Sequence, residues 1–445
     1  MNKSLLIVLL SFALVAVSFS QITWNRVYEF PEPSRANCVI QDSDGNYVVT
    51  GWIGDDEIDV LVMKVDEYGD TIWTRTYGGE EDDEGISIVE SPDGGYVVAA
   101  NTASFAFDWV DIWVLWLNEY GDTISSLIFG GINKDVAYKI INHSEGGYMI
   151  SGIKDHCTYS VWILRLGEDC DTLWTCVYPE IGKEALIVEN SDGTFFISIS
   201  KSDPANLAVL KTSGIGESLW VRNYGSPYLD ETETKSILSI SFNGIVIAFN
   251  GATNWSPDPI ESGGGLFEID SEGEVIGWHY GEEFCGLKAA TQTLDSGYMI
   301  ARHGGTIRKY NTELAYEWSN SFGSSYLYTI EATNDGGFII GGKWYNNLLL
   351  FKTDEWGHID NIEEIIIKPK QIALSVSPNP FNSCCKIETP ENTGIEIVDL
   401  DGRIVRVFDK TPIVWQPEQS VGSAIFLVRA FNEEISTEKK IIYIQ

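Results

Sequence analysis

The sequence predicts an all-β protein: a seven-bladed β-propeller, whose N-terminal strand closes the last blade, followed by a small β-sandwich domain. Three observations support the propeller. A tight-turn sequence recurs along the chain, as in Asp93-Gly94-Gly95-Tyr96. No segment shows the periodicity of a helix. A strand that ends in an aromatic residue recurs in step with the turns, every 42 to 56 residues, at Tyr28, Tyr77, Phe129, Tyr178, Tyr224, Tyr280 and Phe322.

Each copy of the repeat is expected to hold four short strands joined by tight turns. In the second copy the first three strands cover residues 85–89, 96–100 and 111–117, and the fourth ends at Phe129. Asp-Gly and Gly-Gly pairs supply the positive φ angles that tight hairpins need. Four-stranded units at a period of about 40 to 50 residues are typical of a β-propeller, and an open β-solenoid is the alternative.

The order of the strands along the chain predicts how the ring closes. Residues 24–28 supply only the last strand of a unit, and the final unit stops after residues 357–359, where an aromatic strand should follow. The N-terminal strand would therefore complete the last blade and leave no free edge. We expect the propeller to cover residues 21–360, with a linker at residues 361–371.

Residues 1–20 are predicted to be a secretory signal peptide rather than part of the fold. Lys3 precedes an apolar run from Leu5 to Val17, and small residues precede a cleavage point between Ser20 and Gln21. The run is shorter than the roughly 20 residues that span a bilayer. We expect the mature protein to pass through the periplasm to the outer cell surface or the medium, without a transmembrane segment.

The chain is strongly acidic, with 65 Asp and Glu residues, 29 Lys and Arg residues and a net charge of −36. Residues 361–445 contain 12 acids and 9 bases, and Lys3 is the base of the leader, so residues 21–360 hold 53 acids and 19 bases. Such a surface repels phosphate backbones, so nucleic acid is not expected as a partner.

The spacing Asp66-x-x-Gly69-x-x-x-Trp73 resembles the tryptophan-docking repeat of quinoprotein-like and WD40-like β-propellers. The resemblance implies a way of packing blades and no chemistry. Quinone enzymes of that family place two adjacent cysteines beside the cofactor, whereas Cys384 and Cys385 lie outside the propeller. No cofactor is therefore expected.

Residues 372–445 differ in composition and are expected to form the β-sandwich. The segment begins with Pro378-Asn379-Pro380, continues through a strand region with Gly402-Arg403, and ends on Lys439-Lys440 and an apolar stretch. This combination resembles the type A C-terminal sorting domain of type IX secretion substrates. The resemblance implies export by the type IX machinery, removal of the tail, and attachment to the cell surface or release. An ordinary accessory sandwich is the alternative.

Motifs with strong catalytic meaning are absent from the sequence. There is no zinc-protease, nucleophile-elbow, phosphate-loop or dinucleotide motif, and the five histidines are scattered over different repeats. Neither a catalytic residue nor a metal site is therefore predicted. Calcium is a minor alternative at residues 42–45 or 80–84, which are better explained as a hairpin turn and a solvated acidic loop.

The connections on the two faces of the propeller are expected to differ. The Asp-Gly and Tyr-Gly-Asp turns share one face and are tight, while the connections on the opposite face are longer and unlike one another. Aromatic rings beside carboxylates on these longer loops would suit sugar rings, and simple capping of the blade ends is the alternative. The candidate ligand-binding residues are Trp109, Tyr159, Tyr228, Trp255, Trp344, Asp230, Asp258 and Glu261, with Phe105, Phe107 and Tyr345 beside them.

These features predict a secreted or cell-surface propeller for binding or adhesion, with a glycan or a protein as its partner. The first alternative is a glycan hydrolase or lyase that uses two carboxylates about 5–10 Å apart. The second is a structural component of a surface layer. A deep pocket with two converging carboxylates would favour the enzyme, and a shallow aromatic rim would favour binding.

Overall fold

The computed structural model describes residues 21–443 except for residues 156–157, 180, 202–206, 225–229, 241–243, 254–259, 282–283, 285, 324, 360–364, 368–373, 378, 380, 382, 391–392, 400–402, 409–411, 418–422 and 432–435. Within this described part the regular elements are β-strands, and no α-helix occurs. The prediction of an all-β chain built from repeated antiparallel units, as in a β-propeller, is confirmed.

Each repeat forms one sheet of four antiparallel strands, written here from its innermost to its outermost strand. The first three sheets hold β2 (Ser34–Gln41), β3 (Tyr47–Gly54), β4 (Ile58–Val65) and β5 (Thr71–Tyr77); β6 (Asp83–Glu90), β7 (Tyr96–Thr102), β8 (Asp111–Leu117) and β9 (Thr123–Phe129); and β10 (Val136–Asn142), β11 (Tyr148–Lys154), β12 (Ser160–Leu166) and β13 (Thr172–Tyr178). The next three hold β14 (Glu184–Glu189), β15 (Phe195–Ser200), β16 (Leu207–Thr212) and β17 (Ser218–Tyr224); β18 (Asp230–Ile240), β19 (Gly244–Thr253), β20 (Ile260–Ile269) and β21 (Val275–Gly281); and β22 (Leu287–Gln292), β23 (Tyr298–Arg302), β24 (Thr306–Tyr310) and β25 (Tyr316–Ser321).

The last sheet combines both ends of the repeat region. It runs in the order β26 (Tyr326–Ala332), β27 (Phe338–Trp344), β28 (Asn347–Thr353), β1 (Trp24–Tyr28) and β29 (Ile365–Ile367). Strand β1 pairs antiparallel with β28, from Trp24 opposite Lys352 to Tyr28 opposite Leu348. The N-terminal strand thus completes the sheet that the C-terminal repeat begins. The segment predicted as a linker adds a fifth strand, because β29 pairs in parallel with β1.

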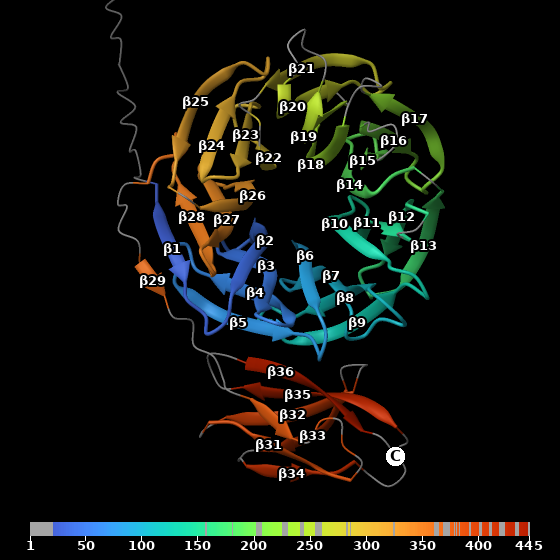
Figure 1. The fold of residues 1–445 in the computed structure, drawn as a ribbon, viewed down its shortest axis with the longest axis vertical. Helices are drawn as coiled ribbons and strands as arrows, with labels where there is room; N and C mark the ends of the chain where they lie inside the picture. Colours follow the sequence, from blue (N-terminus) through green and yellow to red (C-terminus); the bar gives the residue numbers. More distant parts are fainter. Residues whose placement is uncertain are drawn as a thin grey trace, which may run out of the picture.

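The sheets are arranged around a common axis, with β2, β6, β10, β14, β18, β22 and β26 nearest to it (Figure 1). These innermost strands contact one another in that order, and β26 contacts β2. Neighbouring sheets bury their facing side chains between them; for example, Val48 and Val62 of one sheet share a core with Ile88 of the next. Strand β8 is buried along its whole length because sheets cover both of its faces.

Where they occur, the recurring Trp and Tyr residues connect one sheet to the next. Trp24 Nε1 donates a hydrogen bond to the Glu67 carbonyl (2.8 Å), and the Tyr28 hydroxyl donates to the Gly69 carbonyl (2.7 Å). Trp73 contacts the next turn in the same way, with Nε1 donating to the Glu119 carbonyl at 3.1 Å. The repeated turn therefore receives the indole and the phenol of the preceding sheet.

This contact explains the fixed spacing of glycine and tryptophan in the repeat. Gly69 and Gly121 have φ angles of +81° and +79°, which L-residues with a Cβ rarely adopt. A Cβ on Gly121 would also lie 2.9 Å from a ring carbon of Trp73. Both the backbone conformation and the packed indole therefore require glycine there.

Truncation of a buried tryptophan of the repeat is expected to lower the free energy of unfolding more than truncation of a more exposed one. Trp73 is 4% exposed, whereas Trp220, at the equivalent position of a later sheet, is only half-buried. We expect Trp73→Ala to lower the free energy of unfolding by about 3–5 kcal/mol and Trp220→Ala by distinctly less. Urea denaturation of the two variants measures this difference, and equal losses would contradict the role of burial.

The C-terminal tail has a core of its own. One sheet holds β30 (Ser375–Ser377), β31 (Cys385–Glu388) and β34 (Ile413–Trp415), and the other holds β33 (Ile404–Phe408), β32 (Gly394–Asp399), β35 (Ala424–Phe431) and β36 (Ser436–Tyr443). Phe381, Trp415 and Phe426 are buried together, with ring centroids 5.8 and 5.0 Å apart. The tail touches the first repeat sheet, where β36 contacts β5 and Asn379 Nδ2 donates to Glu80 Oε1 at 2.9 Å.

Candidate functional site

The two ends of the sheets form different surfaces. The hairpins β2–β3 and β4–β5 close in tight turns at residues 42–46 and 66–70, and the equivalent turns of the other sheets share this side, which we call the turn face. The β3–β4 connection and the link to the next sheet lie at the opposite ends of the strands, which we call the loop face. The sequence predicts its ligand-binding residues on the loop face.

The described aromatic candidates come from three different sheets. Trp109 is 68% exposed on the loop between β7 and β8, and Phe107 beside it is 78% exposed. Trp344 is half-buried and its ring lies 4.7 Å from that of the exposed Tyr345. Tyr159, on a third sheet, is half-buried and its ring lies 5.5 Å from Lys183 Nζ. Phe105 packs inward, 4.7 Å from Trp113, as a cap on its sheet.

The predicted acidic candidates lie in a part of the chain that the structure describes less completely. Asp230 begins β18, and Glu261 is the second residue of β20. Tyr228, Trp255 and Asp258 lie outside the described residues. A platform built from these acids and the loop aromatics stays a prediction.

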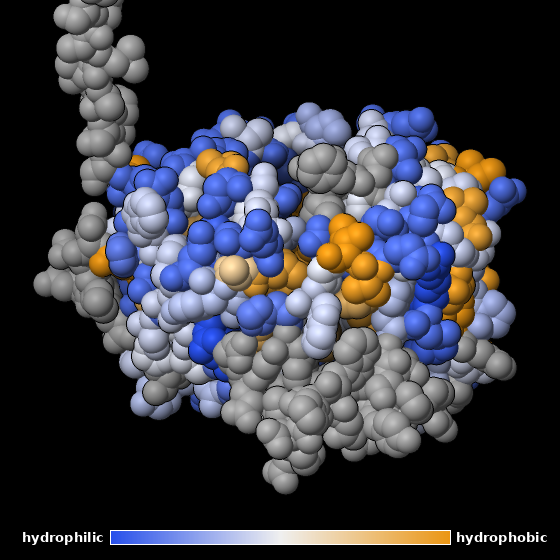
Figure 2. Space-filling view, turned by 90° about the horizontal axis from the view of Figure 1, so that it is seen from above, coloured by the Kyte–Doolittle hydropathy of each residue, from blue (hydrophilic) through white to orange (hydrophobic). Residues whose placement is uncertain are grey.

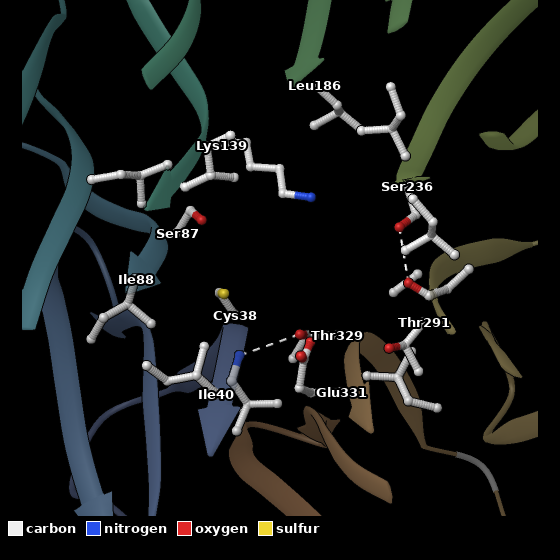
Figure 3. A pocket seen from close by; sticks show the side chains of 18 of the residues that line it. Cys38, Ile40, Ser87, Ile88, Lys139, Leu186, Ser236, Thr291, Thr329 and Glu331 are labelled. Atoms are coloured by element: carbon white, nitrogen blue, oxygen red, sulfur yellow. Dashed lines mark hydrogen bonds between the residues drawn. The ribbon is translucent and has the colours of Figure 1, made fainter. Parts of the chain in front are cut away.

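A channel of about 580 Å³ runs along the axis between the innermost strands (Figure 3). Residues from all seven innermost strands line it, and none of Trp109, Tyr159 or Trp344 does. Figure 3 shows the side chains of Cys38, Lys139 and Glu331 pointing into this space from three different sheets. Sequence reasoning did not identify these residues.

Equivalent positions form a polar ring around the channel. In six of the seven innermost strands a β-bulge shifts the register just before this position, as between Ala36 and Cys38, and the β14–β15 pair has no such shift. A bulge adds one residue and re-aims the side chains beside it. The ring consists of Cys38, Ser87, Lys139, Leu186, Ser236, Ala289 and Thr329.

A second ring lies two residues further along each strand, toward the turn face. It is mostly aliphatic, and Glu331 is its one charged member; the ring consists of Ile40, Val89, Ile141, Val188, Leu238, Thr291 and Glu331. Glu331 is exposed to the channel, and partial desolvation by the surrounding sheets raises its pKa to about 7 against the opposing effect of Lys139. Desolvation likewise lowers the pKa of Lys139 and raises that of the Cys38 thiol.

At the loop-face end of the channel, cations gather around two aromatic rings. The Arg35 guanidinium lies 4.7 Å from the centre of the Tyr328 ring and 5.4 Å from that of Trp52. Lys343 Nζ lies 5.2 Å from Trp52, and Lys288 Nζ lies 5.9 Å from Tyr328. We call these five residues the mouth cluster. Tyr328 and Lys288 are the extra residues of two bulges, so the irregular register places them at the opening.

The repeat itself holds a signal that would have found the polar ring. Six of the seven ring residues lie nine positions before the residue that opens the next strand, as Cys38 does before Tyr47 and Lys139 before Tyr148, and Ser236 lies nine positions before Ile245, the second residue of its next strand. Alignment of the seven copies at that residue therefore shows one channel position that carries six different residue types, with serine occurring twice. The mouth cluster has no such signal, because its cations come from different positions of the repeat.

Two carboxylates converge elsewhere on the loop face, beside Gly78. A Cβ on that glycine would lie 1.9 Å from Asp59 Oδ1 and 2.8 Å from Asp83 Oδ2. Burial and the charge of Asp83 raise the pKa of Asp59 to about 7, and Lys439 of the tail opposes the shift. Neither carboxylate lines the central channel. This pair is therefore not the deep two-carboxylate pocket that would favour a hydrolase.

Asp42 belongs to residues 42–45, the first segment considered for calcium, and its carboxylate stabilises the hairpin turn there. Its Oδ1 accepts hydrogen bonds from the amides of Asp44 (3.1 Å) and Asn46 (2.8 Å), and its Oδ2 pairs with Lys64 Nζ at 2.8 Å. These bonds hold the pKa of Asp42 below its usual range although burial opposes them. Within the described residues, no group of three or more His, Cys, Asp or Glu side chains has a metal-binding arrangement.

The outer rim carries hydrophobic side chains in separate patches among hydrophilic ones (Figure 2). Leu173 and Val177 on β13, and Leu219 and Val221 on β17, are exposed because the outermost strand of each sheet covers nothing beyond itself. In the described part of the chain, no helix is long and apolar enough to cross a bilayer.

No protein-family model and no curated protein matches this chain. Among solved structures, it is similar to the WD40 β-propeller domain of Doa1, with 10% identity over 75% of this chain and 97% of that one, at a TM-score of 0.49. It is also similar to BamB from Moraxella catarrhalis, with 12% identity over 75% of this chain and 94% of that one, at a TM-score of 0.43. For the Dos1 propeller the identity is 10%, the coverage 78% and 98%, and the TM-score 0.47.

Proposed function

We propose that this chain is an exported binding protein: a seven-bladed β-propeller that holds a glycan or protein ligand on its loop face, at the mouth of the central channel. The observation that carries this proposal is the polar ring of the channel. The positions that join sheets repeat nearly the same residue in each copy, whereas the ring position carries thiol, hydroxyl, amine and aliphatic side chains in turn. Varied side chains on a repeated scaffold are typical of a binding site.

Export is the second part of the proposal. The first 20 residues would direct secretion, and residues 372–445 would act as a β-sandwich sorting domain recognised by the type IX machinery. The support from the tail is local: two sheets share one core, and the Arg403 amide donates to Asp399 Oδ1 at 2.8 Å at the turn that carries the motif. Of the other motif residues, Asn379 and Lys439 are described, whereas Pro378, Pro380, Gly402 and the side chain of Lys440 are not.

Filling the channel tests the binding proposal. Leu186 belongs to the polar ring, and its side chain lines the channel (Figure 3). We expect Leu186→Trp to weaken binding of the mature chain on an array of glycans and extracellular proteins by at least about tenfold, because the indole would occupy the site. The matched control is Leu173→Trp on the exposed rim, which should bind like the wild type. Unchanged binding by a folded Leu186→Trp variant would place the site elsewhere.

A further inference from the structure

Two opposite charges face the central channel without pairing with each other. Lys139 of β10 belongs to the polar ring and Glu331 of β26 to the second ring, and both side chains point into the channel (Figure 3). Each is close enough to influence the pKa of the other. In the part of the chain that the structure describes, no hydrogen bond or ion pair holds the Lys139 ammonium or the Glu331 carboxylate. Both charges are therefore available to a ligand.

The surroundings make these unpaired charges unfavourable. Apart from Glu331 and Thr291, the second ring is aliphatic, so the Glu331 carboxylate has mostly apolar neighbours. Desolvation raises the pKa of Glu331 and lowers that of Lys139. Cys38 adds no charge beside them at neutral pH, because desolvation raises the pKa of its thiol. A ligand that brings the opposite charge to each group would reverse both shifts and gain binding free energy.

The rest of the lining offers hydrogen bonds and apolar contact. The Thr329 hydroxyl accepts a hydrogen bond from the Val39 amide at 3.3 Å, which leaves its own proton for a ligand oxygen. Toward the turn face, Ile40 and Ile141 belong to the aliphatic part of the second ring. A volume of about 580 Å³ lies within the range of small-molecule sites.

We propose that the central channel binds a small zwitterion, an α-amino acid with an aliphatic side chain, whose carboxylate meets Lys139 and whose ammonium meets Glu331. This inference goes beyond the proposed function, since that function concerns a glycan or protein at the channel mouth and this ligand lies inside. Both polar contacts are charge-assisted hydrogen bonds, and the aliphatic side chain packs on the second ring.

A ligand with a single charge matches the channel less well. A simple carboxylate at Lys139 would be repelled by Glu331, and a simple amine at Glu331 would be repelled by Lys139. A neutral ligand would leave both charges unpaired in a partly desolvated site. The pair of opposite charges therefore selects a ligand that carries both.

The test compares four probes on the mature chain by calorimetry: L-leucine, isocaproate, isoamylamine and L-leucyl-L-leucine. Isocaproate lacks the ammonium of leucine and isoamylamine lacks its carboxylate, while both keep the aliphatic chain. We expect each of these two to bind at least about tenfold more weakly than the zwitterion, because one charge-assisted contact is lost. Leucine and the dipeptide distinguish a free amino acid from a short peptide, whose charges lie further apart. Equal binding of isocaproate or isoamylamine would overturn the inference.

The variants locate the site. Lys139→Gln should weaken binding of the zwitterion and of isocaproate by at least about tenfold, whereas Glu331→Gln should weaken binding of the zwitterion only. Lys134→Gln and Glu272→Gln remove the same charges from exposed positions outside the channel and should bind like the wild type. Glu331→Gln carries the test if Lys139→Gln does not fold.

Two further outcomes would contradict this inference. Zwitterion binding that survives a folded channel variant would place the ligand elsewhere. Failure of leucine and the dipeptide to bind, together with a glycan or protein ligand found on the array, would overturn the zwitterion site and leave the proposed function standing.

Discussion

Deletion of residues 21–28 from the mature chain is expected to lower the free energy of unfolding by on the order of 5 kcal/mol or more. Strand β1 is the last partner of β28, and Trp24, Val27 and Tyr28 are almost fully buried. Each such side chain contributes about 1.5–3 kcal/mol by burial alone, and the deletion also exposes the edge of β28. That loss is comparable to the whole stability of an ordinary domain. Thermal unfolding followed by circular dichroism measures it.

The matched control for this deletion alters the other neighbour of β1. Replacing residues 365–367 by Gly-Ser-Gly removes β29, which pairs with the outer edge of β1 and takes no part in joining the two ends of the repeat region. We expect this variant to unfold close to the wild-type temperature. A deletion of residues 21–28 that behaves like this control would show that the ring does not depend on its N-terminal strand.

Removal of residues 372–445 is expected to abolish export and to leave the protein folded in the periplasm of a host with type IX secretion. Surface labelling and fractionation of the cells measure the outcome. Stability should change by only about 1 kcal/mol, because the tail has a core of its own and meets the repeat region through β36 and a partly buried hydrogen bond from Asn379 Nδ2 to Glu80 Oε1. The tail fused to an unrelated cargo with a signal peptide should carry that cargo outside.

A control variant and a second measurement test this prediction further. Val414→Ser, at an exposed position of the tail, should leave export unchanged. This control shows that export is lost because the domain is removed, and not because of any change in the tail sequence. Mass spectrometry of the exported wild type should find a C-terminus that lacks Lys439 and Lys440. An intact C-terminus, or export that survives the deletion, would reduce the tail to an accessory sandwich.

The repeated strands and their closure were predictable because both depend on local sequence. The turn glycines, the Trp and Tyr spacing and the alternation of tight turns specify four-stranded hairpin units without knowledge of the rest of the chain. Closure followed from counting: the repeat starts with one spare strand and ends with one missing, and β1 pairs with β28 accordingly. The strand formed by residues 365–367 was missed, since three apolar residues in a predicted linker have no periodicity to read.

Burial at equivalent positions could not be read from the repeat. Trp24, Trp73 and Trp220 occupy the same place in their copies, yet the first two are buried and the third is half-exposed. The exposure of an indole depends on the turn that the next sheet presents to it, which differs from one copy to another. The same holds for the loop aromatics, where Trp109 is exposed and Phe105 packs inward.

The sequence by itself therefore determined the repeat, the strand count of each unit and the order of closure. Only the tertiary structure decided which side chains meet at the axis. Cys38, Lys139 and Glu331 are separated by about a hundred residues or more along the chain, and they share one channel because seven sheets bring their first strands together. Bulges in six of those strands then set which residue faces the axis and which sits at the mouth, as with Tyr328 and Lys288. Contacts between such distant residues form only when the ring closes, so no local pattern records them.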